Sequence, residues 1–167
     1  MVNGILIVFA TVAVCMDLKR EKIDNRWIAV GWVLGFTYQL VQRGLPGVGI
    51  FLAGAAVPIL LLYLLFYFRM IGAGDVKLLS VLGGFMGPVS VAVCAGISLV
   101  FGAVLSLGVL ILCGNLVPRL RYFTGYFIQL MTTKKVAPYM VRGRRMENIH
   151  FSVPVLMGIL LFAGGYY

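Results

Sequence analysis

Long apolar stretches separated by short charged segments run through the whole chain. Five such stretches stand out, at residues 2–16, 27–41, 48–68, 78–117 and 151–166. A helix that crosses a bilayer needs about 20 apolar residues. The stretch 78–117 contains no charged residue and is long enough for two helices, which we expect to turn at Gly87-Pro88. The pattern therefore predicts an all-α membrane protein with six transmembrane helices, of which the first, fourth and sixth are short.

The composition supports a membrane protein and excludes ordinary soluble classes. Hydrophobic residues make up 62% of the 167 residues and charged residues 11%, with a mean hydropathy of +1.04. A soluble domain is about half apolar and about a quarter charged, so a cytosolic enzyme and a disordered chain are both excluded. We expect one transmembrane domain over residues 1–167. The cysteines form no Cys-x-x-Cys pair, so no zinc site is indicated.

The basic residues predict how the chain is oriented. If the N-terminus lies outside, the loops after the first, third and fifth helices are cytoplasmic, and they hold every Lys and Arg except Arg43. This satisfies the positive-inside rule and places both termini outside a multi-pass inner (cytoplasmic) membrane protein. The net charge of +9 then forms a basic face toward anionic membrane lipids, and we expect no nucleic-acid partner.

The loop between the fifth and sixth helices, at residues 116–148, is the longest. It mixes basic and aromatic side chains, including Arg119, Arg121, Tyr122 and Phe123. Such mixtures are typical of helices that lie among lipid headgroups. We therefore expect a cytoplasmic interfacial helix here.

Two acids are expected at one membrane depth. Asp17 ends the first helix and Asp75 opens the fourth, both at the predicted cytoplasmic boundary. Carboxylates at the edge of a membrane helix are costly and usually functional. Two carboxylates that share one proton can activate water and protonate a peptide carbonyl. Helix dipoles lead us to expect that Asp75 is the ionised member and that Asp17 holds the proton.

The residues around Asp75 are candidates for binding an extended peptide. Gly72 and Gly74 precede the acid and Lys77 follows it. Because glycine adopts backbone angles closed to other residues, we expect residues 70–75 to form a flexible, non-helical loop that a substrate can approach closely. Gly72, Gly74 and Lys77 are therefore the candidate substrate-binding residues.

Three segments resemble one family. Gly72-Ala73-Gly74-Asp75 matches the Gly-x-Gly-Asp motif of membrane aspartyl proteases. Residues 17–25 resemble the segment after the first core helix of type IV prepilin peptidases, with Asp24 where the family has Pro, and residues 149–154 resemble the entry to its last helix, again without the Pro. The order of the segments also matches. Because it has no Cys-x-x-Cys pair, the chain resembles the small, peptidase-only members, such as Tad-type or archaeal preflagellin peptidases.

This resemblance implies an aspartic endopeptidase that removes the basic leader of prepilin-like proteins on the cytoplasmic side. It implies Asp17 and Asp75 as catalytic residues, with no metal and no cofactor. Larger members carry Cys-x-x-Cys pairs and also methylate the product, whereas this chain has no such pair, so S-adenosylmethionine is not implied. The particular substrate and the oligomeric state are left open.

Other interpretations remain open. Asp75 and Asp24 are well placed as N-caps of the fourth and second helices, and Asp17 could pair with Arg20 or Lys22. The protein could be a small transporter in which the acids bind an ion or relay a proton. It could also be a non-enzymatic pilus-assembly membrane protein whose acids only cap helices.

Overall fold

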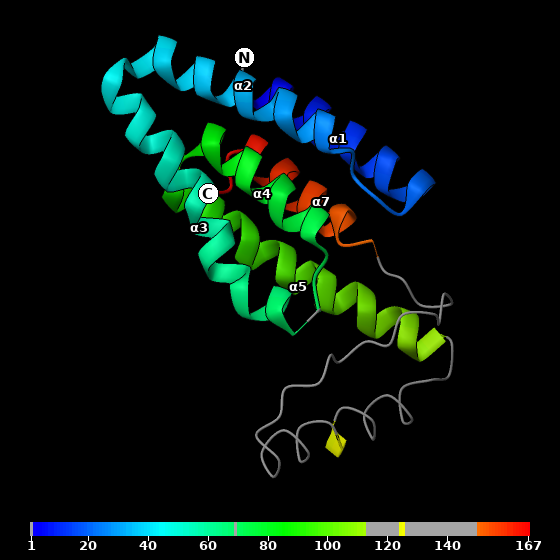
Figure 1. The fold of residues 1–167 in the computed structure, drawn as a ribbon. Helices are drawn as coiled ribbons and strands as arrows, with labels where there is room; N and C mark the ends of the chain where they lie inside the picture. The colour runs from blue at the N-terminus through cyan, green and yellow to red at the C-terminus, as the bar shows by residue number, and fades with distance from the viewer. Residues whose placement is uncertain (1, 69, 113–123, 126–149) are drawn as a thin grey trace.

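The computed structural model describes residues 2–68, 70–112, 124–125 and 150–167, and within them the chain is all-helical. Figure 1 shows the helices arranged as one bundle with α4 at its centre. In chain order they are α1 (Val2–Arg20), α2 (Asn25–Arg43), α3 (Leu45–Tyr67), α4 (Ala73–Met86), α5 (Pro88–Leu112) and α7 (Ser152–Ala163). The all-α prediction is confirmed.

Three of the described helices, α1, α3 and α5, are long and apolar enough to cross a membrane. The helices α4 and α7 have only 14 and 12 residues. At about 1.5 Å per residue they are shorter than the hydrocarbon core, which is about 30 Å thick. The structure therefore supports a membrane protein with three candidate spans. The predicted interfacial helix at residues 116–148 lies outside the described residues, apart from 124–125.

The predicted break at Gly87-Pro88 separates α4 from α5. Gly87 has a positive φ of 85° and its amide donates to the carbonyl of Gly83, which closes α4, and Pro88 begins α5. Proline fits the first turn of a helix because the amide hydrogen it lacks would have no partner there. The sequence thus predicted this boundary correctly.

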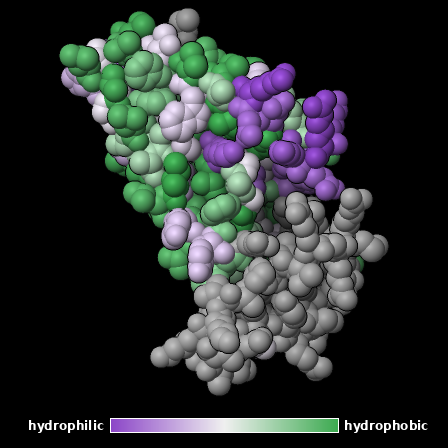
Figure 2. Space-filling view, viewed as in Figure 1, coloured by the Kyte–Doolittle hydropathy of each residue, from purple (hydrophilic) through white to green (hydrophobic). Residues whose placement is uncertain are grey.

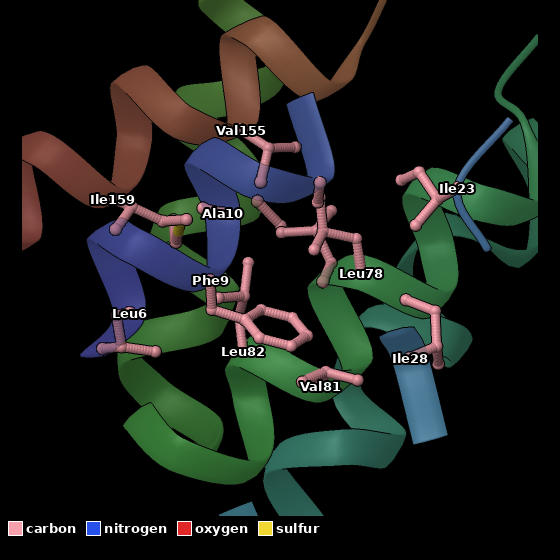
Figure 3. Packing of buried hydrophobic residues seen from close by; sticks show 14 of the residues in the cluster. Leu6, Phe9, Ala10, Ile23, Ile28, Leu78, Val81, Leu82, Val155 and Ile159 are labelled. Carbon is pink, nitrogen blue, oxygen red and sulfur yellow. The ribbon is translucent and has the colours of Figure 1, made fainter. Parts of the chain in front are cut away.

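The core of the bundle lies around α4. Leu78, Val81 and Leu82 are almost fully buried and meet Leu6 and Phe9 of α1, as Figure 3 shows. The α7 residues Val155 and Ile159 complete the same cluster. These contacts fix the axial position of α4 against α1 and α7.

The outer surface of the bundle is strongly apolar. On α3 alone, Leu60, Tyr63 and Leu64 are each more than half exposed. Figure 2 shows that hydrophobic residues cover most of one face, while hydrophilic residues gather at the end where α1 joins α2. A soluble monomer rarely exposes so extensive an apolar surface. The surface therefore agrees with a protein that is embedded in lipid and carries its polar residues at one end.

Candidate active site

Asp17 lies in the last turn of α1, where its carboxylate is held by residues at the start of α7. Ser152 Oγ donates a hydrogen bond to Asp17 Oδ2 over 2.6 Å, and His150 Nδ1 lies 3.1 Å from the same oxygen. The Asp17 side chain is 14% exposed and that of His150 is 24% exposed. Asp17 is therefore largely shielded from solvent and bound to a segment more than 130 residues away in the sequence.

The helix α1 extends further than the apolar pattern predicted, through Arg20 rather than Met16. Lys19 and Arg20 lie in its last turn, where positive charge is favourable at the negative end of the helix dipole. Glu21 follows with a φ of 52°, and its amide donates to the carbonyl of Asp17. Asp17 is thus held on ordered helix rather than on a loop.

Asp75 is the third residue of α4, and the N-cap of this helix is Gly72. The prediction that Asp75 itself is the N-cap is therefore wrong. Its side chain accepts a hydrogen bond from the backbone amide of Gly72. An acid at the third helical position that returns to the N-cap amide is half of a capping box, and it stabilises the start of the helix.

The two acids share one site. Asp75 interacts electrostatically with Asp17 and with His150. Three helix ends supply these groups: the end of α1, the start of α4 and the start of α7, which Figure 1 shows on the same side of the bundle. The arrangement brings together the two acids that the sequence singled out, and it adds two residues that the sequence did not.

The glycine segment is more regular than predicted. Ala73, Gly74 and Asp75 are helical, and Gly72 before them is extended, with φ −73° and ψ 146°. The expectation of a non-helical loop over residues 70–75 is therefore wrong for its last three residues. The physical reason is the contact between Asp75 and the Gly72 amide, which supplies one of the hydrogen bonds that a helix start lacks.

Gly72 and Gly74 differ in how much space surrounds them. A Cβ on Gly72 would lie 3.2 Å from Asp75 Oδ2, whereas one on Gly74 would lie 3.7 Å from Ile23, an ordinary contact distance. Gly72 therefore leaves the room that the Asp75 carboxylate occupies. Gly74 has space for a methyl group.

Asp24 and Lys77 make hydrogen bonds at the start of α2. Asp24 Oδ1 accepts from the backbone amide of Arg26 over 3.0 Å and is the N-cap of α2, which confirms the capping interpretation of Asp24. Lys77 Nζ donates to Asn25 Oδ1 over 3.0 Å. Lys77, the fifth residue of α4, thus links this helix to the first residue of α2 on the exposed surface.

His150 and Ser152 were not predicted as site residues. The available signal was the only histidine of the sequence, followed two residues later by a serine, just where the last apolar stretch begins. Polar residues at the entry of a membrane helix are common, so this signal did not distinguish a site residue from a boundary residue. The contact with Asp17 identifies them.

A bundle of apolar helices with two carboxylates at one polar end defines a helical membrane protein with a candidate acid–base site. The chain belongs to the type IV leader peptidase family, whose family model matches residues 4–107. The match includes Asp17 and Asp75 and ends before α7. Membership of this family indicates a protease. Comparisons with curated proteins and with solved structures give no match.

Proposed function

We propose that the protein is an aspartic endopeptidase that removes the basic leader peptide from prepilin-like proteins. Asp17 and Asp75 are its catalytic residues. The observation that carries the proposal is the convergence of these two carboxylates, from α1 and α4, at the polar end of an apolar bundle in a chain of the leader peptidase family. No metal and no organic cofactor is part of the proposal.

The chemistry follows from two acids that share a single proton. Two neighbouring carboxylates in a poorly solvated site resist double ionisation, so one is ionised and the other protonated. The ionised member removes a proton from water as the water attacks the scissile carbonyl carbon. The protonated member gives its proton to the carbonyl oxygen. Because the two carboxylates lie at the membrane boundary, they can reach a peptide bond next to an apolar substrate helix.

The proposal places the site at the cytoplasmic face of a six-span protein with both termini outside. The basic residues Lys19, Arg20, Lys22 and Arg26 surround the α1–α2 connection. This agrees with the positive-inside rule. The short helices α4 and α7, of 14 and 12 residues, then cross the membrane only in part.

Gly72, Gly74 and Lys77 are proposed to contact the substrate. Gly72 and Lys77 are exposed near Asp75 in the chain, and Gly74 between them is partly exposed. Unlike the expected flexible loop, this surface is the first turn of a helix, so the substrate rather than the enzyme must supply the extended backbone.

Co-expression with a full-length prepilin-like protein, carrying a basic leader, a glycine and an apolar helix, tests the function. Cleavage should shorten the substrate on a gel, and mass spectrometry should place the cut at the end of the leader. An uncleaved substrate that is stably co-expressed in the same membrane would contradict the proposal and favour a transport or assembly role.

A further inference from the structure

The Asp17 carboxylate carries two donors on one oxygen. Ser152 Oγ and His150 Nδ1 both contact Oδ2, at 2.6 and 3.1 Å. Among the residues that the structure describes, no hydrogen bond is made to Oδ1. Within the described part of the chain, the carboxylate is therefore held through Oδ2.

The short contact between Ser152 Oγ and Asp17 Oδ2 has the length of a hydrogen bond to an ionised carboxylate. Hydrogen bonds from a hydroxyl to an ionised oxygen measure about 2.5–2.7 Å, shorter than bonds between neutral groups. Ser152 is fully buried, so this hydroxyl has no competing bulk water. An ionised Oδ2 can only accept, and Nδ1 of His150 then carries the hydrogen that it donates.

The two carboxylates differ in the hydrogen-bond donors and helix dipoles that favour their ionised form. Asp75 accepts from the Gly72 amide. Asp17 accepts from a buried hydroxyl and an imidazole, and it also lies at the positive end of α7, which begins at Ser152. This second dipole opposes the unfavourable one at the end of α1. Hydrogen bonds to the charged form of an acid favour that form.

We propose that Ser152 and His150 are positioning residues that hold Asp17 ionised, so that Asp17 activates water and Asp75 holds the shared proton. The inference rests on the proposed function and reverses the roles expected from α1 and α4 alone. Water loses a proton to Asp17 Oδ1 as its oxygen bonds to the scissile carbon. The Asp75 proton passes to the carbonyl oxygen and gives a neutral gem-diol.

The second half of the reaction restores both acids. Asp75 takes a hydroxyl proton back from the gem-diol, Asp17 gives its proton to the departing nitrogen, and the C–N bond breaks. The products are a carboxylic acid and an amine, and Asp17 is again ionised. Ser152 and His150 keep their hydrogens throughout, which is why they position the reacting group without being catalytic residues themselves.

The test compares kcat and KM of the full-length protein in lipid nanodiscs, with the prepilin-like protein described above as substrate. Ser152→Ala and His150→Leu should each lower kcat about 10-fold or more, with KM within about twofold of the wild type. His150→Asn should recover most of this loss, because its amide nitrogen can take the place of Nδ1. Ser98→Ala is the matched control: Ser98 is fully buried and donates to the Cys94 carbonyl, away from Asp17.

A readout that needs no activity keeps the inference separate from the proposed function. The infrared difference spectrum of Ser152→Ala against the wild type should show shifted bands of an ionised carboxylate, and the shift should vanish when Asp17→Asn is also present. If the wild type cleaves but Ser152→Ala behaves like Ser98→Ala, the inference is overturned and the proposed function stands. If the wild type does not cleave, the proposed function fails. A change in the protonated carboxyl bands instead would show that Asp17 holds the proton, and would overturn the inference in either case.

Discussion

Gly54 of α3 and Gly83 of α4 meet backbone to backbone where the two helices cross. A Cβ on either glycine would overlap the carbonyl oxygen of the other. Small residues allow such close approach between membrane helices, where lipid offers no hydrophobic force to drive association. The crossing therefore sets the distance of α4, and with it Asp75, from the rest of the bundle.

Substitution at this crossing should destabilise the protein. Gly83→Ala should lower the thermal midpoint of the purified protein by several degrees, since neither backbone can move without disturbing the packing of α4. Gly96→Ala is the control, because nothing lies within 4 Å of the Cβ position on Gly96. It should leave the midpoint unchanged or raise it, as alanine favours helix. Equal midpoints for the two variants would contradict the close α3–α4 packing.

The two glycines before Asp75 should separate into different kinetic effects. Gly72→Ala brings a methyl group to 3.2 Å from Asp75 Oδ2, so the carboxylate must shift and kcat should fall about 10-fold. Gly74→Ala disturbs no group of the site, so any effect should appear in KM through the approach of the substrate. Steady-state kinetics of both variants, with thermal midpoints alongside, measure the difference. A normal kcat for Gly72→Ala would contradict the packing of the Asp75 carboxylate against this glycine.

Gln39 should stabilise the far end of α4. Its Nε2 donates to the carbonyls of Gly84 and Phe85, both at 3.1 Å, which belong to the last turn of the helix. Gln39→Leu removes these donors in a buried place and should cost about 1 kcal/mol of unfolding free energy, the usual size of a polar contact between membrane helices.

Equilibrium unfolding in a denaturing detergent measures this loss. Thr37→Val is the control, because the Thr37 hydroxyl donates to the Val33 carbonyl within α2 only, over 2.8 Å. It should change the free energy of unfolding far less than Gln39→Leu does. A Gln39→Leu variant as stable as the wild type would show that α4 does not depend on the hydrogen bonds from Gln39.

Features set by neighbouring residues could be predicted from the sequence, and features set by distant contacts could not. The break at Gly87-Pro88 and the Asp24 cap of α2 depend on local backbone chemistry, and both predictions are confirmed. The helical start at Ala73 depends on the return of the Asp75 side chain to the Gly72 amide, which the motif alone did not reveal.

The partners of Asp17 show most clearly what could not be predicted from the sequence. Sequence proximity suggested an ion pair of Asp17 with Arg20 or Lys22. In the structure, Ser152 and His150 contact the Asp17 carboxylate. These lie across the bundle, and only the packing of α7 against α1 brings them to the end of α1. The expectation that Asp17 holds the proton used only the dipoles of α1 and α4, and it took no account of these two donors or of the start of α7.

Cleavage kinetics of the two aspartate variants test the central claim most directly. The purified protein in lipid nanodiscs is assayed as wild type, Asp17→Asn, Asp75→Asn and the double variant, with Asp24→Asn as the control that keeps the α2 cap. Each single variant should lose at least about 1,000-fold in rate, and the double variant should be no slower than either, because groups that act as one unit are not additive. Asp24→Asn should cleave at a rate close to that of the wild type. The paired-carboxylate account would be contradicted if a folded Asp17→Asn or Asp75→Asn variant kept about a tenth or more of the wild-type cleavage rate.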